Sequence, residues 1–211
     1  MSDNTNRKVP SVVIKRLPRY YRYFGELLNQ GIKRISSNAL SEKMGVTASQ
    51  IRQDFNYFGG FGQQGYGYKV EYLYNTIGDI LGLHEGYTTI IVGAGNLGRA
   101  LANHNFAKRG FRLMGMFDID ERIIGSKVNN VEIYHIDMME SFVRENNIDV
   151  GILTVPKSEI ESIADRLCAC GIKGLWNYSY AELKPKNNIP IENVHLSDSL
   201  MTLSYKIKQK E

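Results

Sequence analysis

The chain has 211 residues, enough for one large domain or two small ones. Its content of 43% hydrophobic and 23% charged residues is ordinary for a soluble globular protein, and no apolar run approaches the ~20 residues of a membrane helix. The first residues lack the apolar segment of a secretory signal, so we expect a cytoplasmic protein. Cys168 and Cys170 stand too close together for a useful disulfide or a zinc site, and no metal is predicted.

The charge is unevenly distributed along the chain. Residues 1–53 contain ten Lys or Arg and three Asp or Glu, a balance of +7, whereas residues 86–211 contain fifteen of each. A basic first part beside a neutral remainder indicates an anionic polymer as the partner of that first part. Charge alone leaves a simple solvated basic surface as an equal alternative.

Residues 1–83 are predicted to form a helical domain. Pro10 can open a helix at its first turn, and apolar residues then recur near helical spacing. Pro18 breaks or restarts this run, and Gly31 stops it.

Two further helices are joined by a tight turn. Ser36 can cap the first of them, which Gly45 ends. Thr47-Ala48-Ser49-Gln50 is a capping box, so the next helix starts there. This arrangement predicts a helix-turn-helix, whose second helix enters the major groove of DNA.

Alternating glycines and aromatics over residues 57–70 predict a two-stranded hairpin with Gln63, Gln64 and Gly65 at its centre. A hairpin directly after a recognition helix is the wing of a winged helix. Residues 71–83 have the pattern of a connecting helix.

Residues 84–194 alternate between strand and helix. Strands are expected over 88–92, 112–117, 131–135, 149–154, 172–177 and 193–196, and helices over 97–108, 137–146 and 158–169. Such alternation predicts an α/β domain with a doubly wound, Rossmann-like parallel sheet.

A glycine-rich loop follows the first of these strands. Gly93, Gly95 and Gly98 have the spacing G-x-G-x-x-G and open a helical segment, and Asp118 closes the next predicted strand. The first glycine permits the tight turn, the second lets the backbone approach a pyrophosphate, and the third lets helix and strand pack closely. Asp118 is placed to accept hydrogen bonds from a ribose and would repel a 2′-phosphate, so NAD is favoured over NADP. A glycine turn without a ligand is the alternative.

Two more segments, 154–156 and 176–180, follow strand ends and could form walls of the nicotinamide half of a cleft, although ordinary packing explains their aromatics equally well.

Catalytic groups are harder to find. Tyr180 and Lys184 have the spacing of a short-chain dehydrogenase pair, but Pro185 excludes the long helix that such a pair needs. The sequence therefore indicates a protein that reads its dinucleotide, and no enzyme is predicted.

Several blocks of this sequence, in order along nearly the whole chain, resemble the Rex family of redox-sensing transcriptional repressors. They are "VPSVVIKRLPRYYRYFGELLNQG", "RISSNALSEKMGV", "IRQDFNYFGGFG", "GYGY", "VGAGNLGRAL" and "LTVP". The resemblance implies a homodimer whose N-terminal winged helices bind a palindromic operator in double-stranded DNA. Its Rossmann-like domains would bind NADH and NAD⁺ competitively, and NADH would favour release from DNA.

The resemblance also assigns roles to residues. The pyrophosphate loop maps to Gly93, Gly95, Asn96, Leu97 and Gly98, the ribose contact to Asp118, and the nicotinamide surroundings to Thr154, Val155, Pro156 and Asn177. The major-groove readers map to Gln50, Arg52 and Gln53, and the minor-groove finger to Gln63, Gln64 and Gly65. The last helix, within residues 195–211, resembles the family's exchanged dimerisation helix, although a simple docking helix has the same apolar period.

The sequence departs from the family at two places. Residues 53, 63 and 64 are Gln where the family usually has Lys or Arg. His104 and His195 stand where the family has the Tyr and Asp that join Arg22 in a redox-dependent network. The leading prediction is thus an NAD(H)-responsive repressor. An oxidoreductase with an accessory helical domain, or a DNA-binding relative that has lost its redox response, remains an alternative.

Overall fold

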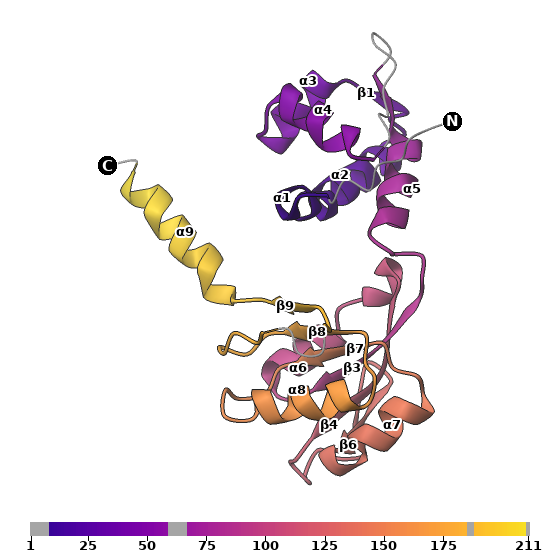
Figure 1. The fold of residues 1–211 in the computed structure, drawn as a ribbon, viewed down its shortest axis with the longest axis vertical. Coiled ribbons are helices and arrows are strands. Elements are labelled where there is room, and N and C mark those ends of the chain that lie inside the picture. Colours follow the sequence, from indigo (N-terminus) through magenta and orange to yellow (C-terminus); the bar gives the residue numbers. More distant parts are fainter. Residues whose placement is uncertain (1–8, 59–66, 185–187, 210–211) are drawn as a thin grey trace. The chain divides into compact units, whose positions relative to one another are not determined.

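The computed structural model describes residues 9–58, 67–184 and 188–209, and the chain divides into two compact units, Met1–His84 and Glu85–Glu211 (Figure 1). Each unit has its own hydrophobic core. The predicted wing residues Gln63, Gln64 and Gly65 lie outside the described ranges.

The first unit is a helical domain with one short antiparallel ribbon. Its helices are α1 (Ser11–Ile14), α2 (Leu17–Asn29), α3 (Ser37–Met44), α4 (Ala48–Asn56) and α5 (Val70–Ile80). Its strands β1 (Arg34–Ile35) and β2 (Tyr68–Lys69) pair with each other. The predicted helix-turn-helix is α3 and α4.

The helix boundaries in this unit follow from local chemistry. Pro18 lies in the first turn of α2, after the break at Lys15 and Arg16. The hydroxyl of Ser36 accepts a hydrogen bond from the backbone N–H of Ala39 at 3.1 Å, which caps α3. Gly45 ends that helix with φ +62°, a left-handed conformation that few other residues adopt. These predicted boundaries are confirmed.

The capping box at the start of α4 is only half formed. The Thr47 hydroxyl accepts from the backbone N–H of Gln50 at 3.1 Å, as predicted. The side chain of Gln50 donates instead to Asp54, one turn further on. This hydrogen bond sets the orientation of the Gln50 side chain on α4.

Most of the hairpin predicted over residues 57–70 lies outside the described residues and stays a prediction; in its described part, β2 pairs with β1. Arg34 lies opposite Lys69 and Ile35 opposite Tyr68. Two residues are too few to produce a periodic pattern, so β1 could not be recognised from the sequence.

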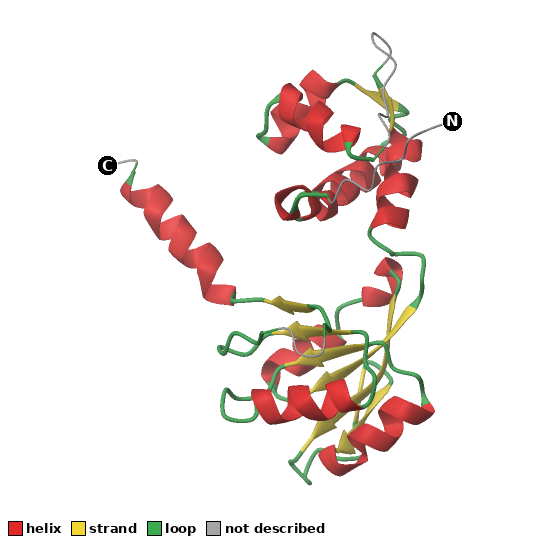
Figure 2. Ribbon diagram, in the orientation of Figure 1, coloured by secondary structure: helices red, strands yellow, loops and turns green. Residues whose placement is uncertain are grey.

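The second unit is built on a seven-stranded sheet, shown in yellow in Figure 2. The strands are β3 (Tyr87–Val92), β4 (Phe111–Asp118), β5 (Lys127–Val128), β6 (Val131–His135), β7 (Val150–Leu153), β8 (Gly174–Asn177) and β9 (Ile191–Asn193). Their order is β5-β6-β4-β3-β7-β8-β9, with only β5 antiparallel to its neighbour. Numbered by themselves, the six parallel strands have the order 3-2-1-4-5-6, which is that of a Rossmann fold.

Helices cover both faces of this sheet. Ile90 and Val92 of β3 pack in the cluster that contains residues of α7 (Met139–Glu145) and α8 (Ile160–Ala169). Ile91, between them, packs in the cluster on the other face, with residues of α6 (Asn96–Ala102). Continuous apolar strands are expected where a parallel sheet is buried on both sides.

Four details of this unit differ from the prediction. The strand expected over 193–196 is β9 at Ile191–Asn193, and β5 was not anticipated. The helix expected over 97–108 is split into α6 and a 3₁₀ turn at Phe106–Arg109. A similar 3₁₀ turn at Ile136–Met138 precedes α7.

The last helix, α9 (Leu196–Lys208), begins shortly after β9. It contains no buried residue, and its six large hydrophobic side chains are 51–66% exposed. A helix that leaves so many large apolar side chains exposed within its own unit marks an interaction surface.

Candidate functional site

The glycine-rich loop lies where the strand order reverses, between β3 and β7. Gly93 follows β3 with φ +100°, and a Cβ atom there would lie 2.8 Å from the carbonyl oxygen of Thr154, which follows β7. A Cβ at Gly98 would overlap the carbonyl oxygen of Gly93. At Gly95, by contrast, a Cβ would meet nothing within 4 Å, so the backbone is open to an approaching ligand. Ligands of open α/β sheets bind at this reversal point.

Thr154 ties the two strand ends together. Its hydroxyl donates to the carbonyl oxygen of Gly93 at 2.7 Å and lies 3.1 Å from that of Val92. Val155, which packs partly against the core, and the exposed Pro156 continue the chain from there. The structure therefore brings Thr154 against the glycine-rich loop, and Val155 and Pro156 follow it in the chain.

Asp118 has a role that the sequence did not reveal. Its carboxylate accepts from the backbone N–H of Ala94 at 2.6 Å, and from those of Ile119 and Asp120 at 2.7 and 3.0 Å. It thereby fixes the glycine-rich loop to the end of β4. A carboxylate has about four acceptor positions, so one remains for a ribose hydroxyl.

Arg122 forms an ion pair with its neighbour Asp120. Its guanidinium donates two hydrogen bonds to the carboxylate of Asp120, at 2.8 and 2.7 Å. These hydrogen bonds lower the pKa of Asp120 to about 2. The pairing leaves Arg122 poorly placed to hold a 2′-phosphate, which agrees with the preference for NAD.

Asn177 is fully buried at the end of β8. Its amide donates to the carbonyl oxygen of Ala181 and to the side chain of Asn193, and its own oxygen accepts from the backbone N–H of Ser179. Because both ends of the amide are engaged, we expect Asn177 to shape the cleft wall rather than to touch the nicotinamide with its side chain. The place of Asn177 in the nicotinamide surroundings stays a prediction.

The three predicted switch residues belong to different units. Arg22 is exposed on α2 of the first unit. In the second unit, the ring of the exposed His104 lies 4.5 Å from that of Phe106, and His195 precedes the first turn of α9. The network among these residues stays a prediction.

In the first unit, α4 carries the predicted DNA-reading residues. Arg52 and Gln53 are exposed, and Arg52 donates to the hydroxyl of Ser37 at 3.1 Å. Gln50 is half-buried, and its Nε2 donates to Oδ1 of Asp54 at 2.9 Å.

Asp54 is a fully buried carboxylate that sequence reasoning missed. Arg16 donates to both of its oxygens at 2.7 Å, and the hydroxyl of Tyr20 donates to Oδ2 at 2.9 Å. Burial alone would raise the pKa of this carboxyl, but the hydrogen bonds from Arg16, Gln50 and Tyr20 outweigh it and lower the pKa. The carboxylate thus joins α4 to the start of α2. The sequence does contain a sign of this buried carboxylate, because an acidic residue lies between Ile51 and Phe55 on the apolar face of α4.

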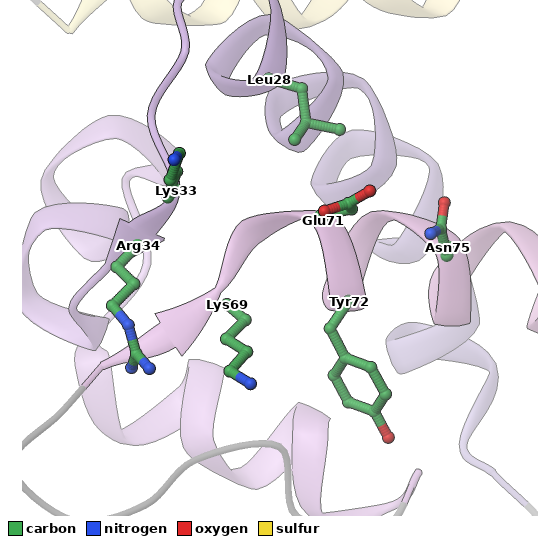
Figure 3. Close-up of a pocket in the computed structure, with 7 residues that line it drawn as sticks. All are labelled: Leu28, Lys33, Arg34, Lys69, Glu71, Tyr72 and Asn75. Atoms are coloured by element: carbon green, nitrogen blue, oxygen red, sulfur yellow. The ribbon is translucent and has the colours of Figure 1, made fainter.

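A groove of about 620 Å³ lies beside the β1–β2 ribbon (Figure 3). It is lined by Leu28, Lys33, Arg34, Lys69, Glu71, Tyr72 and Asn75. Arg34 and Lys69 are direct cross-strand partners, and their side chains extend to the same side of the ribbon as Tyr72. Like charges directly opposite each other destabilise a ribbon, and the carboxylate of Glu71 lines the same groove.

Comparisons with known proteins agree with this geometry. Residues 8–56 match a family described as the N-terminus of putative DNA-binding proteins, and residues 84–181 match one described as a CoA binding domain. The redox-sensing transcriptional repressor Rex of Thermoanaerobacter pseudethanolicus is 58% identical, over 97% of this chain and 92% of its own. The Rex of Clostridium novyi is 52% identical, over 94% of this chain and 95% of its own.

Solved structures give the same result. The structure of RSP with β-NAD⁺ and operator DNA has a TM-score of 0.90 and 55% identity, over 97% of this chain and 95% of that one. RSP with β-NADH has a TM-score of 0.89 and 53% identity, over 96% and 95%. RSP is described as a Rex-family repressor. On this identity and coverage, the chain belongs to the Rex family of redox-sensing transcriptional repressors.

Proposed function

We propose that this protein is a transcriptional repressor that binds operator DNA and responds to the NADH/NAD⁺ ratio, with NADH favouring release. One observation carries the proposal: a capped helix-turn-helix and a glycine-rich loop at the switch point of a Rossmann sheet occur in one chain. Membership of a family of repressors argues against the oxidoreductase alternative. A repressor acts where the DNA is, so we place it in the cytoplasm.

The ligand is a nicotinamide dinucleotide rather than coenzyme A. Both RSP complexes hold forms of NAD. The Asp118 carboxylate at the end of β4 can accept from a ribose hydroxyl, whereas it would repel the ribose phosphate of coenzyme A. Gly93, Gly95, Asn96, Leu97 and Gly98 would hold the pyrophosphate with backbone N–H groups. Thr154, Val155 and Pro156 would lie toward the nicotinamide.

The functional form is a homodimer. The exposed apolar residues of α9 need a covering surface, and a second copy of this chain supplies one without any other partner. A symmetric dimer would also present two copies of α4, matching the two half-sites of a palindromic operator.

One titration tests the function. Labelled operator duplex bound to the full chain is followed by fluorescence anisotropy as NADH is added at fixed total NAD(H). We expect the duplex to be released as the NADH fraction rises. A chain that retains no duplex at moderate salt would be an oxidoreductase or another NAD-binding protein, and a chain that retains duplex regardless of NADH would have lost the redox response.

A further inference from the structure

The side-chain amide of Gln50 is held in one orientation. Asp54 accepts all four hydrogen bonds that a carboxylate can take: two from Arg16, one from Tyr20 and one from Gln50. An ionised carboxylate cannot donate, so the end of the Gln50 amide that faces it must be the NH₂ group. The carbonyl oxygen, Oε1, is then the other end of the amide.

The position of Gln50 on α4 gives this orientation a consequence for DNA. Gln50 is the third residue of the helix, and recognition helices of helix-turn-helix proteins contact base edges with their N-terminal residues. In the major groove, adenine and cytosine present amino groups that donate, whereas guanine O6 and thymine O4 accept. If it faces the groove, a carbonyl oxygen accepts from the amino groups of the first two bases and is repelled by the carbonyl oxygens of the last two.

Resting on the proposed function, we propose that Asp54 is a positioning residue that fixes Gln50 as a hydrogen-bond acceptor, so that each α4 selects a base with an exocyclic amino group. The second N–H of the amide adds a donor for N7 of adenine, which makes adenine the preferred base over cytosine. The Arg16–Asp54 pair thus sets base specificity from inside the protein, without touching DNA.

Base analogues test this inference. Duplexes are first selected from a random pool by the full chain, and each adenine or cytosine in the selected site is then replaced singly. Purine removes N6 from adenine, 7-deazaadenine removes N7, and 2-pyrimidinone removes N4 from cytosine. We expect one position in each half-site where loss of the amino group weakens binding roughly 5- to 150-fold.

Three variants assign that position to Gln50. Gln50→Ala should bind more weakly and lose sensitivity to the amino group at that position. Asn56→Ala, which removes an exposed amide from the same helix at a position with no predicted DNA contact, should keep that sensitivity. Asp54→Asn can donate as well as accept, so the Gln50 amide can turn over, and discrimination at that position should fall although Gln50 is present.

The comparison of Gln50→Ala with Asn56→Ala decides the matter even where Asp54→Asn does not fold. The inference requires an amino group whose removal weakens binding of the parent but not of Gln50→Ala. If no such amino group is found, the inference is overturned. It is also overturned if the position read by Gln50 is a guanine or thymine. A parent that selects no duplexes would overturn the repressor function as well, so the two failures are distinguishable.

Discussion

Three aspartates of this chain show how surroundings decide what a carboxylate does. Asp54 is fully buried and ion-paired, and it joins two helices. Asp118 accepts backbone hydrogen bonds that shape the ligand loop, and Asp120 holds the exposed Arg122. The residue type predicts none of these differences, because each depends on donors contributed by other segments.

Asp118 should matter for the dinucleotide and not for DNA. Asp118→Ala removes the ribose acceptor and the bond to the Ala94 N–H, so we expect NADH binding to weaken by about 1–3 kcal/mol. Calorimetry of the full chain with NADH measures this. Glu121→Ala, which removes an exposed carboxylate nearby, should leave the affinity unchanged. Unaltered NADH affinity in Asp118→Ala would contradict the assignment.

Asp54 should make the first unit sensitive to acid. Its pKa is lowered in the folded state, so its contribution to stability is present above the unfolded pKa of about 3.9 and is lost as pH falls through the folded value. Asp54→Ala should cost about 3 kcal/mol at neutral pH, the lower end for a broken buried pair, since Arg16 is 27% exposed.

Urea unfolding followed by circular dichroism at pH 7 and pH 3 measures both effects. The acid loss in the first unit should be smaller in Asp54→Ala than in the parent. Trp176, the single Trp, lies in the second unit, and its fluorescence provides an internal control. An equal acid loss in both proteins would show that another carboxylate is responsible.

At the scale of elements, the features that depend on neighbouring residues could be predicted from the sequence, and those that depend on tertiary contacts could not. The boundaries at Ser36 and Gly45 follow from neighbouring residues, and so does the alternation that gives the parallel sheet. Strands β1 and β5 have two residues each and exist only through their pairing. The glycine-rich loop was found from its spacing, but Asp54 was not, because its partner Arg16 is 38 residues away.

The β1–β2 ribbon should add sequence-independent affinity for DNA. Arg34→Gln and Lys69→Gln each remove a cation from the groove, so both should weaken binding to operator and to unrelated duplex alike. Each should also reduce the slope of log affinity against log salt by about one unit for a lost phosphate contact. Glu71→Gln, in the same groove, should tighten binding instead. Binding curves at several salt concentrations measure the slopes, and unchanged slopes would place the groove away from the duplex.

For the molecule as a whole, the exposed apolar residues of α9 bear on the oligomeric state. Leu196, Leu200, Leu203 and Ile207 form a stripe at helical spacing, and Met201 and Tyr205 lie on the opposite side. Apolar residues on two sides indicate a helix inserted between surfaces rather than laid on one. Asp198, Thr202 and Lys206 occupy the remaining polar side.

A charge in the stripe of Leu196, Leu200, Leu203 and Ile207 should therefore separate the subunits. It should also weaken DNA binding, because a monomer can no longer bind both half-sites at once. Leu203→Asp places a charge where the proposed interface is apolar, so we expect a monomer in analytical ultracentrifugation at micromolar concentration. A monomer engages one half-site, so its affinity for the palindrome should fall toward that for an isolated half-site. Thr202→Asp makes a similar charge change one residue away on the polar side and should remain dimeric with near-parent affinity. If Leu203→Asp stays dimeric and binds the palindrome as the parent does, the subunits associate through another surface and α9 docks elsewhere.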